Sequence, residues 1–214
     1  MDIEEKLYTF SRFSQVSRET INSLKIYKKI LLKTNKTLNL IGKSTTNNIW
    51  QRHFLDSAQV IDFIDKSDKN LLDLGTGAGF PGLIIALMAK DRKINIKVKL
   101  IEKSPKKIKF LSQVIEKLNL KTELINQNVF DDTYKIKEEV IVARAFKPLK
   151  NILELIHNKA ENWKKILIFL GKTGENELLQ ASKSWDMKYK QRVSITSDDS
   201  FVIEINKLSK KQIE

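Results

Sequence analysis

The stretch that most constrains the fold is a glycine-rich turn between two apolar runs. Residues 71–74 form a short apolar run that includes Asp73, and residues 83–88 form the apolar run after the turn. Residues 75–82 between them hold four of the seven glycines in the chain. This order predicts a buried β-strand, a tight loop and an α-helix. Glycines in such a loop let the backbone approach a ligand where a Cβ atom would clash.

Two classes of nucleotide-type cofactor fit this loop. Gly77, Gly79 and Gly82 match the G-x-G-x-x-G pattern of dinucleotide sites, in which a pyrophosphate lies at the helix N-terminus. S-adenosylmethionine instead carries an ammonium, a carboxylate and a sulfonium. Asp73 at the strand end would repel a pyrophosphate and attract an ammonium, so it favours S-adenosylmethionine. The alternative role for Asp73 is to cap the loop.

A second acid follows the next predicted strand. Residues 98–101 are largely apolar and end at Glu102, slightly beyond the spacing of about 20 residues typical of an acid that binds a ribose. Both candidate cofactors contain such a ribose. Glu102 therefore supports a nucleoside ligand without choosing between them, and its alternative role is that of a surface acid.

Strand and helix patterns alternate from residue 70 onward. The patterns predict strands near 70–74, 96–101, 122–126, 139–143 and 165–170, and helices near 81–91, 105–119, 148–160 and 174–184. Such alternation is typical of a parallel sheet with helices on both faces. Residues 188–195 and 201–205 alternate apolar and polar side chains around residues 196–200, which predicts a hairpin. We expect the sheet to finish with an antiparallel strand.

The first 69 residues form a predicted helical extension, and residues 70–214 form one α/β domain. The chain has 214 residues, enough for one substantial core. Ser17 is a candidate N-cap for a first helix. Its apolar positions at helical spacing are Ile21, Leu24, Tyr27 and Leu31. After a looser stretch at residues 34–46, a second helix is predicted over residues 47–63.

The predicted second helix carries a polar group made of Arg52, His53, Asp56 and Ser57. His53 should reach Asp56 or Ser57, which lie one turn further along the same face. With Arg52, these side chains would contact an RNA phosphate or base. The favoured alternative is that they hydrogen-bond within the fold and lock the extension over the glycine loop.

Composition limits the classes of partner and site. Lys and Arg number 39 against 26 acids, for a net charge of +13, which favours a polyanion such as nucleic acid, although a lysine-rich composition alone has the same effect. The chain has no cysteine, which excludes disulfides, thiolate metal sites and cysteine nucleophiles. No apolar run is long enough for a bilayer, and residues 1–6 do not resemble a signal peptide. We expect a cytoplasmic protein without membrane or metal partners.

Polar residues follow several other predicted strands. Asn128 and Val129 come after the third strand, where ligands of open α/β sheets bind, and would meet an adenine. Arg144 and Phe146 follow the fourth strand and should emerge at the rim of the cofactor pocket. Arg144 would hold a carboxylate or phosphate there, or form a structural ion pair.

A helix start is predicted at Ser104 and Pro105, which puts Lys106 and Lys107 in its first turn. The helix dipole disfavours cations at that position. The placement indicates an anionic partner, or a solvated charge cluster that Glu102 offsets.

Together these motifs resemble the bacterial small-subunit ribosomal RNA guanine-N7 methyltransferase family, formerly called glucose-inhibited division protein B. The resemblance covers nearly the full length and rests on Asn39-Leu40-Ile41, Arg52-His53-x-x-Asp56-Ser57, Asp73-x-Gly75-Thr76-Gly77-x-Gly79-Phe80-Pro81-Gly82, Lys106-Lys107-x-x-Phe110-Leu111 and Ala143-Arg144-Ala145. The chain departs from the family in two places. It has Ile41 where the family usually has threonine, and Leu170-Gly171-Lys172-Thr173-Gly174 where a Lys-Gly pair is usual.

The resemblance implies S-adenosylmethionine-dependent methylation of N7 of one guanine in 16S rRNA. It also implies a Rossmann-like class I methyltransferase fold with a mostly parallel seven-stranded sheet. The candidate cofactor-binding residues are Asp73, Gly75, Gly77, Phe80, Glu102, Asn128, Val129 and Arg144. The candidate RNA-contacting residues are Arg52, His53, Lys106, Lys107 and Lys172. The expected partner is 16S rRNA or the small ribosomal subunit, and the expected state is a monomer.

The residue inventory is compatible with this reaction. Methylation of a pyrimidine C5 generally needs a cysteine nucleophile, and methylation of an exocyclic amine typically uses an Asn/Asp-Pro-Pro-aromatic motif; the chain has neither. Guanine N7 has a free lone pair and needs no general base, so alignment of the reactants is the main task. The sequence singles out no catalytic residue. The alternatives are a methyltransferase for a small molecule or protein, a nicotinamide-dependent oxidoreductase, and a non-enzymatic RNA-binding module.

Overall fold

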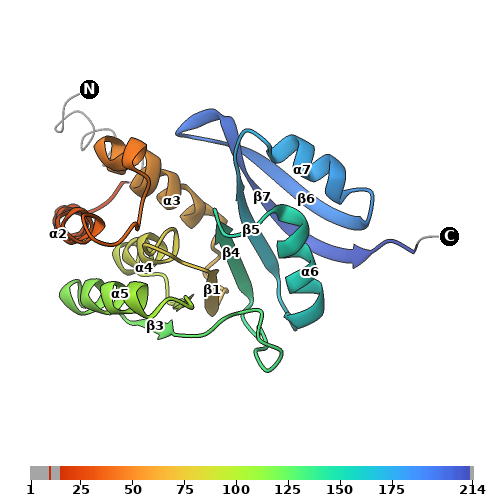
Figure 1. Ribbon diagram of the computed structural model, residues 1–214, viewed down its shortest axis with the longest axis horizontal. Helices are drawn as coiled ribbons and strands as arrows, with labels where there is room; N and C mark the ends of the chain where they lie inside the picture. Colours follow the sequence, from red (N-terminus) through yellow and green to blue (C-terminus); the bar gives the residue numbers. More distant parts are fainter. Residues whose placement is uncertain (1–9, 11–14, 213–214) are drawn as a thin grey trace.

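Seven strands form one mixed sheet through the middle of the molecule (Figure 1). The computed structural model describes residue 10 and residues 15–212. The strand order across the sheet is β3-β2-β1-β4-β5-β7-β6. The strands are β1 (Asn70–Leu74), β2 (Lys97–Ile101), β3 (Thr122–Ile125), β4 (Val140–Arg144), β5 (Lys165–Leu170), β6 (Trp185–Ser194) and β7 (Ser197–Lys210). The first five strands match the predicted ones to within one residue at most ends.

The five parallel strands end together at one edge of the sheet. In the register of the ladders, Leu74 pairs with Ile101, and Ile101 pairs with Ile125. On the other side, Arg144 pairs with Phe169. Residues that follow these strands are therefore brought to one edge, where ligands of open α/β sheets bind.

The last two strands confirm the predicted antiparallel hairpin but not its dimensions. β7 pairs antiparallel with β5 and with β6. Residues 196–200 were expected to form the turn, yet β7 already begins at Ser197 and only two residues, Ile195 and Thr196, join the strands. The polar run was misleading because half-exposed hairpin strands tolerate polar residues on their solvent face.

Helices cover both faces of the sheet (Figure 1). One face is covered by α4 (Gly82–Asp91), α5 (Pro105–Lys117) and the N-terminal helix α2 (Arg18–Asn35). The other face is covered by α6 (Leu149–Lys159) and α7 (Gly174–Ala181). This arrangement confirms the predicted α/β architecture.

Each face has its own apolar core. Tyr27 of α2 is fully buried on the first face, where its ring stacks on Phe54 and Phe80 at centroid distances of 5.5 and 5.6 Å. On the second face, Leu149 and Trp185 belong to a separate buried cluster. The N-terminal segment is thus part of the first core rather than an appendage.

The N-terminal segment begins as predicted and then becomes irregular. Ser17 caps α2, because its Oγ accepts a hydrogen bond from the Thr20 backbone N–H at 3.2 Å. The predicted regular helix over residues 47–63 is instead a series of short turns. They comprise a 3-10 turn (Lys43–Asn48), a π-helical turn (Trp50–Leu55), a short α-helical turn (Asp56–Ala58) and a second 3-10 turn (Gln59–Phe63). Single π-helical turns are frequent near functional sites.

Within the described part of the chain, no helix has both the length and the apolar character needed to cross a bilayer. The N-terminal residues 1–6, which we did not read as a signal peptide, lie outside the described residues. The division into residues 1–69 and 70–214 as separate units stays a prediction.

Candidate functional site

The glycine loop joins β1 to α4 and lies at the carboxyl edge of the sheet. Gly75, Gly77 and Gly79 have positive φ angles of 61°, 59° and 90°, a backbone region that favours glycine. A Cβ atom on Gly75 would in addition overlap the ring of Phe146. The loop therefore depends on glycine for its conformation, and at Gly75 also for the close approach of a neighbouring side chain.

Asp73, at the end of β1, fixes the glycine loop by hydrogen bonds. Its side chain is fully buried, and Oδ2 accepts hydrogen bonds from the Thr76 hydroxyl and from the Gly82 backbone N–H, the latter at 2.9 Å. The other oxygen, Oδ1, has no hydrogen-bond partner. Burial raises the pKa of Asp73 to about 6, although the bonds from Thr76 and Gly82 oppose the shift. Asp73 therefore caps the loop, as the alternative interpretation held, and its Oδ1 is buried beneath the loop without a partner.

Glu102 stands directly after β2 and faces the same loop. Its Oε2 accepts from the Gly77 backbone N–H at 3.1 Å, and its Oε1 accepts from the Ser104 N–H at 2.9 Å. α5 begins at Pro105, as predicted. The Ser104 side chain makes no capping hydrogen bond there, and the Ser104 backbone N–H is bonded by Glu102 instead. Glu102 is therefore an organised acid between the loop and α5, not a surface acid.

A cavity opens between the glycine loop and the residues that follow β2, β3 and β4; we call it the cofactor cavity. Of the candidate cofactor residues, Gly75, Glu102, Asn128 and Val129 line it. Its other lining residues are Ile101, Lys103, Lys107, Gln127, Phe130, Ala145, Phe146 and Lys147. The structure thus brings together residues separated by more than 50 positions in the sequence.

Two aromatic rings, those of Phe130 and Phe146, line the cofactor cavity, and the sequence pointed to only one of them. Phe130 stacks on Phe146 at a centroid distance of 5.8 Å and an angle of 18°. Lys147 Nζ lies 5.9 Å from the centre of the Phe130 ring. Phe146 had been placed at the rim from its position after β4, whereas Phe130 and Lys147 were missed. Their only sequence signal is that each directly follows a candidate residue at a strand end.

Arg144 lies beside the cofactor cavity rather than in its lining, so its contact with the cofactor stays a prediction. It lines not the cofactor cavity but an adjacent one, the second cavity, which touches the first at Ala145. The remaining residues of the second cavity are Arg52, Asp56, Phe169, Leu170, Gly171, Ser194, Thr196, Ser200 and Phe201. Arg144 Nε donates to Asp56 Oδ2 at 2.9 Å, so the alternative of a structural ion pair is confirmed.

The polar motif of the N-terminal segment locks onto this arginine. Arg144 Nη2 donates to the Arg52 carbonyl at 2.6 Å, and Nη1 lies 3.3 Å from His53 Nδ1. The expected bond from His53 to Asp56 or Ser57 was wrong. His53 Nε2 instead bonds Thr45 Oγ1 at 2.9 Å, because the π-helical turn changes the spacing of side chains on the helix. The motif thus fixes the extension to the β4 end, as its favoured interpretation held.

His53 is buried and uncharged at neutral pH. Burial, followed by the neighbouring Arg144 and Arg52 guanidinium groups, lowers the pKa of His53 to about 3. Its ring stacks on Phe80 at a centroid distance of 4.9 Å and an angle of 15°. A side chain in this position cannot reach an RNA in the described conformation, unlike the exposed side chain of Arg52.

Phe80 also points away from the cofactor cavity. Its side chain is buried between His53 and Tyr27, and it is not among the lining residues. Any contact of Phe80 with a cofactor would therefore be through its backbone. The sequence could not show this, because the ring is directed by α2 and the π-helical turn, which lie far away in the sequence.

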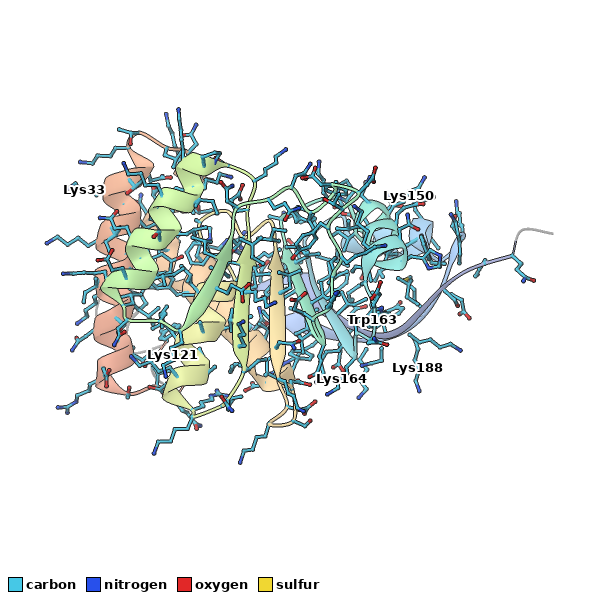
Figure 2. All side chains as sticks on the ribbon, turned by 90° about the horizontal axis from the view of Figure 1, so that it is seen from below. Lys33, Lys121, Lys150, Trp163, Lys164 and Lys188 are labelled. Carbon is cyan, nitrogen blue, oxygen red and sulfur yellow. The ribbon has the colours of Figure 1, made fainter. Side chains whose placement is uncertain are left out.

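The remaining basic candidates lie at the same edge of the sheet. Lys106 is exposed, and Lys107 lines the cofactor cavity with its Nζ 4.0 Å from Glu102 Oε2. Lys172 is highly exposed and pairs with Asp199 at 3.3 Å. Positive charge is not confined to this edge. Figure 2 shows Lys33 and Lys121 at the end that carries α2 and α5, Lys164 near the middle of the lower edge, and Lys150 and Lys188 toward the other end.

Comparison with known proteins shows the family of this chain. A family model described as GidB, rRNA small subunit methyltransferase G, matches residues 20–202. The chain belongs to this family. A ribosomal RNA small subunit methyltransferase G of Pelagibacter ubique is 39% identical over 208 residues, which cover 96% of this chain and 97% of the relative. The protein of the same name from Orientia tsutsugamushi is 36% identical over 94% of this chain and 98% of its own length.

Solved structures with lower identity share the fold. M. capricolum TrmK in complex with S-adenosyl-homocysteine aligns with a TM-score of 0.53 at 18% identity, over 70% of this chain and 66% of that chain. The 16S rRNA methylase RmtB aligns with a TM-score of 0.52 at 13% identity, over 90% of this chain and 76% of that chain. These likenesses show the fold alone. Membership of the GidB family, described as rRNA small subunit methyltransferase G, makes this chain a methyltransferase that uses S-adenosylmethionine rather than a nicotinamide-dependent oxidoreductase.

Proposed function

We propose that this GidB family member transfers a methyl group from S-adenosylmethionine to N7 of one guanine in 16S rRNA. The observation that carries the proposal is the state of the acids in the two cavities. Among the described residues that line them, the carboxylates are Glu102 and Asp56, and both are engaged in hydrogen bonds within the protein. A site without a free base suits a nucleophile whose lone pair is already available, as at guanine N7.

The residues of the cofactor cavity fit the proposed cofactor. Glu102 offers carboxylate oxygens suited to ribose hydroxyls, while Asn128 and Val129 provide an amide and an apolar surface suited to an adenine. Asp73 lies beneath the glycine loop rather than in the lining of the cavity, and the negative charge on its unpartnered Oδ1 is suited to the ammonium of the methionine part. S-adenosylmethionine supplies the methyl group on an activated sulfonium. The chain's own contribution is then to align the reactants and to exclude water.

The basic rim supports RNA as the substrate. Lys103, Lys107 and Lys147 all line the cofactor cavity, and Lys103 and Lys147 are exposed to solvent. Cations at this position would hold backbone phosphates around the reacting base. The monomeric state and the cytoplasmic location stay predictions.

The test is transfer of a labelled methyl group from S-adenosylmethionine to small-subunit RNA and to whole small subunits. The product is mapped by chain cleavage at N7-methylguanine. We expect label at a single guanine, and none with Gly75→Arg, whose side chain cannot be placed beside Phe146. Label at another atom, in protein or in a small molecule would overturn the proposal.

The role of Asp73 toward the cofactor has its own test. We expect Asp73→Asn to weaken S-adenosylmethionine binding at pH 8 by tenfold or more, measured by calorimetry, because the amide removes the charge that meets the ammonium. Unchanged affinity would assign Asp73 to the support of the loop alone. The matched control is Asp62→Asn, which makes the same chemical change at an exposed ion pair with Arg92.

A further inference from the structure

The glycine loop is also held by the N-terminal helix α2. Tyr27 of this helix is fully buried, and its hydroxyl donates a hydrogen bond to the backbone carbonyl of Ala78 in the loop. The two residues lie 51 positions apart in the chain, so the bond depends on the packing of α2 against the first face of the sheet. Asp73 and Glu102 hold the loop from the strands, and Tyr27 adds a polar contact from the N-terminal segment.

The bond from Tyr27 fixes one peptide unit of the loop at both ends. The Ala78 carbonyl accepts from Tyr27, and the Gly79 N–H of the same peptide unit donates to the Thr76 carbonyl at 2.8 Å. A peptide unit is planar, so bonds at its two opposite groups set its rotation. Gly79 has a φ of 90°, a conformation that glycine adopts readily and other residues do not. The Tyr27 hydroxyl therefore helps to select this one conformation from the several open to glycine.

The fixed peptide unit is connected to the cofactor cavity through Thr76 and Gly77. The Thr76 N–H donates to the Ile101 carbonyl at 3.1 Å, at the end of β2. The next N–H, that of Gly77, donates to Glu102, which lines the cavity. A rotation of the peptide unit between Ala78 and Gly79 would therefore disturb backbone groups that bond a residue of the cavity. Tyr27 acts on the cofactor through the loop, without lining the cavity itself.

The Tyr27 hydroxyl is a closely fitted and permanent donor. A Cβ atom on Gly79 would lie 2.6 Å from the hydroxyl oxygen, so the tip of the ring reaches the loop backbone. The ring itself is held by Phe80 and Phe110, at centroid distances of 5.6 and 6.5 Å. Burial, and then the charge of Asp73, raises the pKa of Tyr27 well above its ordinary value. The hydroxyl therefore keeps its proton at neutral pH and can always donate it to the loop.

We propose that Tyr27 is a positioning residue of the cofactor site, because its hydroxyl orders the glycine loop before S-adenosylmethionine binds. A site that is ordered in advance loses less conformational entropy when its ligand arrives. Removal of the hydroxyl should therefore weaken cofactor binding and leave the transfer step unchanged. The inference concerns the cofactor and goes beyond the proposed RNA target, so it does not depend on which atom of the RNA is methylated.

Tyr27→Phe tests this role, since it removes one oxygen atom and keeps the packing of the ring. We expect the dissociation constant for S-adenosylmethionine, measured by calorimetry, to rise by about 2- to 10-fold, the range for loss of one hydrogen bond. Binding of S-adenosylhomocysteine should weaken by the same factor. In the transfer assay, KM for S-adenosylmethionine should rise likewise, whereas kcat and KM for the RNA should stay at the wild-type values.

Glycine-selective isotope labelling for NMR shows whether the change is confined to the loop. The chain has seven glycines, so few resonances have to be assigned. We expect the amide resonances of Gly77 and Gly79 to move in Tyr27→Phe, and those of Gly42 and Gly171, outside the loop, to stay. Unmoved signals from Gly77 and Gly79 would show that the hydroxyl does not set the loop backbone.

Two control variants separate positioning from general stability. Leu24→Val removes packing atoms from the same buried face of α2, and should lower the stability of the protein without changing its affinity for the cofactor. Tyr134→Phe makes the same chemical change at a half-buried tyrosine outside the lining of both cavities, and should alter neither affinity nor KM. The inference is wrong if Tyr27→Phe keeps the wild-type affinity, or if Leu24→Val weakens binding equally.

Hydrogen exchange of the wild type tests the same connection if Tyr27→Phe does not fold. Bound S-adenosylhomocysteine should slow the exchange of backbone amides at residues 24–31, because a ligand that stabilises the loop also stabilises the helix bonded to it. Unchanged exchange in this part of α2 would overturn the inference. If the wild type binds the cofactor but methylates an atom other than guanine N7, the proposed function fails, and the binding data alone decide the role of Tyr27.

Discussion

The buried carboxylate of Asp73 makes the stability of the protein depend on pH in a direction unusual for an acid. Its pKa rises from 3.8 to about 6 on folding, chiefly because of burial. The folded protein therefore holds this proton more tightly than the unfolded chain. The stability so gained is complete below pH 3.8 and is lost as the pH rises through 6, by about 3 kcal/mol in total and about 1.4 kcal/mol between pH 5 and pH 8.

Asp73→Asn isolates this effect. The amide oxygen can take the bonds from Thr76 and Gly82, and the amide nitrogen takes the place of the unpartnered Oδ1. We expect the free energy of unfolding of the wild type to fall between pH 5 and pH 8 by about 1.4 kcal/mol more than that of the variant. Other titrating groups cancel in this comparison.

Urea unfolding, followed by tryptophan fluorescence at pH 5, 6.5 and 8, measures the difference. The control Asp62→Asn makes the same change at an exposed position and should follow the pH profile of the wild type. Parallel profiles for the wild type and Asp73→Asn would mean that Asp73 binds its proton equally well in the folded and unfolded chain. That result would refute the reasoning from burial.

Three further predictions concern the loop, the polar network and the basic rim. Gly75→Ala should lower the free energy of unfolding by about 1–3 kcal/mol, through the positive φ and the crowded ring beside it, and weaken cofactor binding in calorimetry; a fully stable variant would contradict this. Asp56→Ala should cost about 3–5 kcal/mol in urea unfolding because it leaves the largely buried Arg144 without its carboxylate, whereas Asp62→Ala at an exposed pair should cost under about 1 kcal/mol; equal losses would refute the network. Lys107→Gln should weaken rRNA binding and reduce the salt dependence of log affinity by about one, and an unchanged slope would remove Lys107 from the RNA surface.

The sequence was sufficient where the signal is local. The apolar run, Asp73 and the glycines predict strand, loop and helix because the pattern and the backbone freedom of glycine act within a few residues. The same holds for Glu102 after β2 and for Asn128 and Val129 after β3. Parallel strands end at one edge, so their following residues meet there without further information. Glu102, Asn128 and Val129 line the cofactor cavity together with Gly75, as expected, whereas Asp73 and Gly77 do not.

The sequence failed where side chains are directed by distant segments. Phe80 was predicted to contact the cofactor, but it packs between Tyr27 and His53, which belong to the N-terminal segment. The π-helical turn at residues 50–55 breaks the regular spacing on which the expected bond from His53 to Asp56 depended. Helical periodicity cannot reveal such a turn, since its geometry is set by what the segment packs against.

The sequence by itself thus determined the class of fold, the glycine cradle and the family, because these depend on local pattern and on the order of motifs. Only the tertiary structure decided that Arg144 belongs to the second cavity. The residues that hold it, at positions 52, 53 and 56, lie about 90 positions away in the chain, and no local pattern encodes that meeting. The physical reason is that the orientation of a guanidinium is set by its hydrogen-bond partners, and these come together only when the N-terminal segment packs against the end of β4.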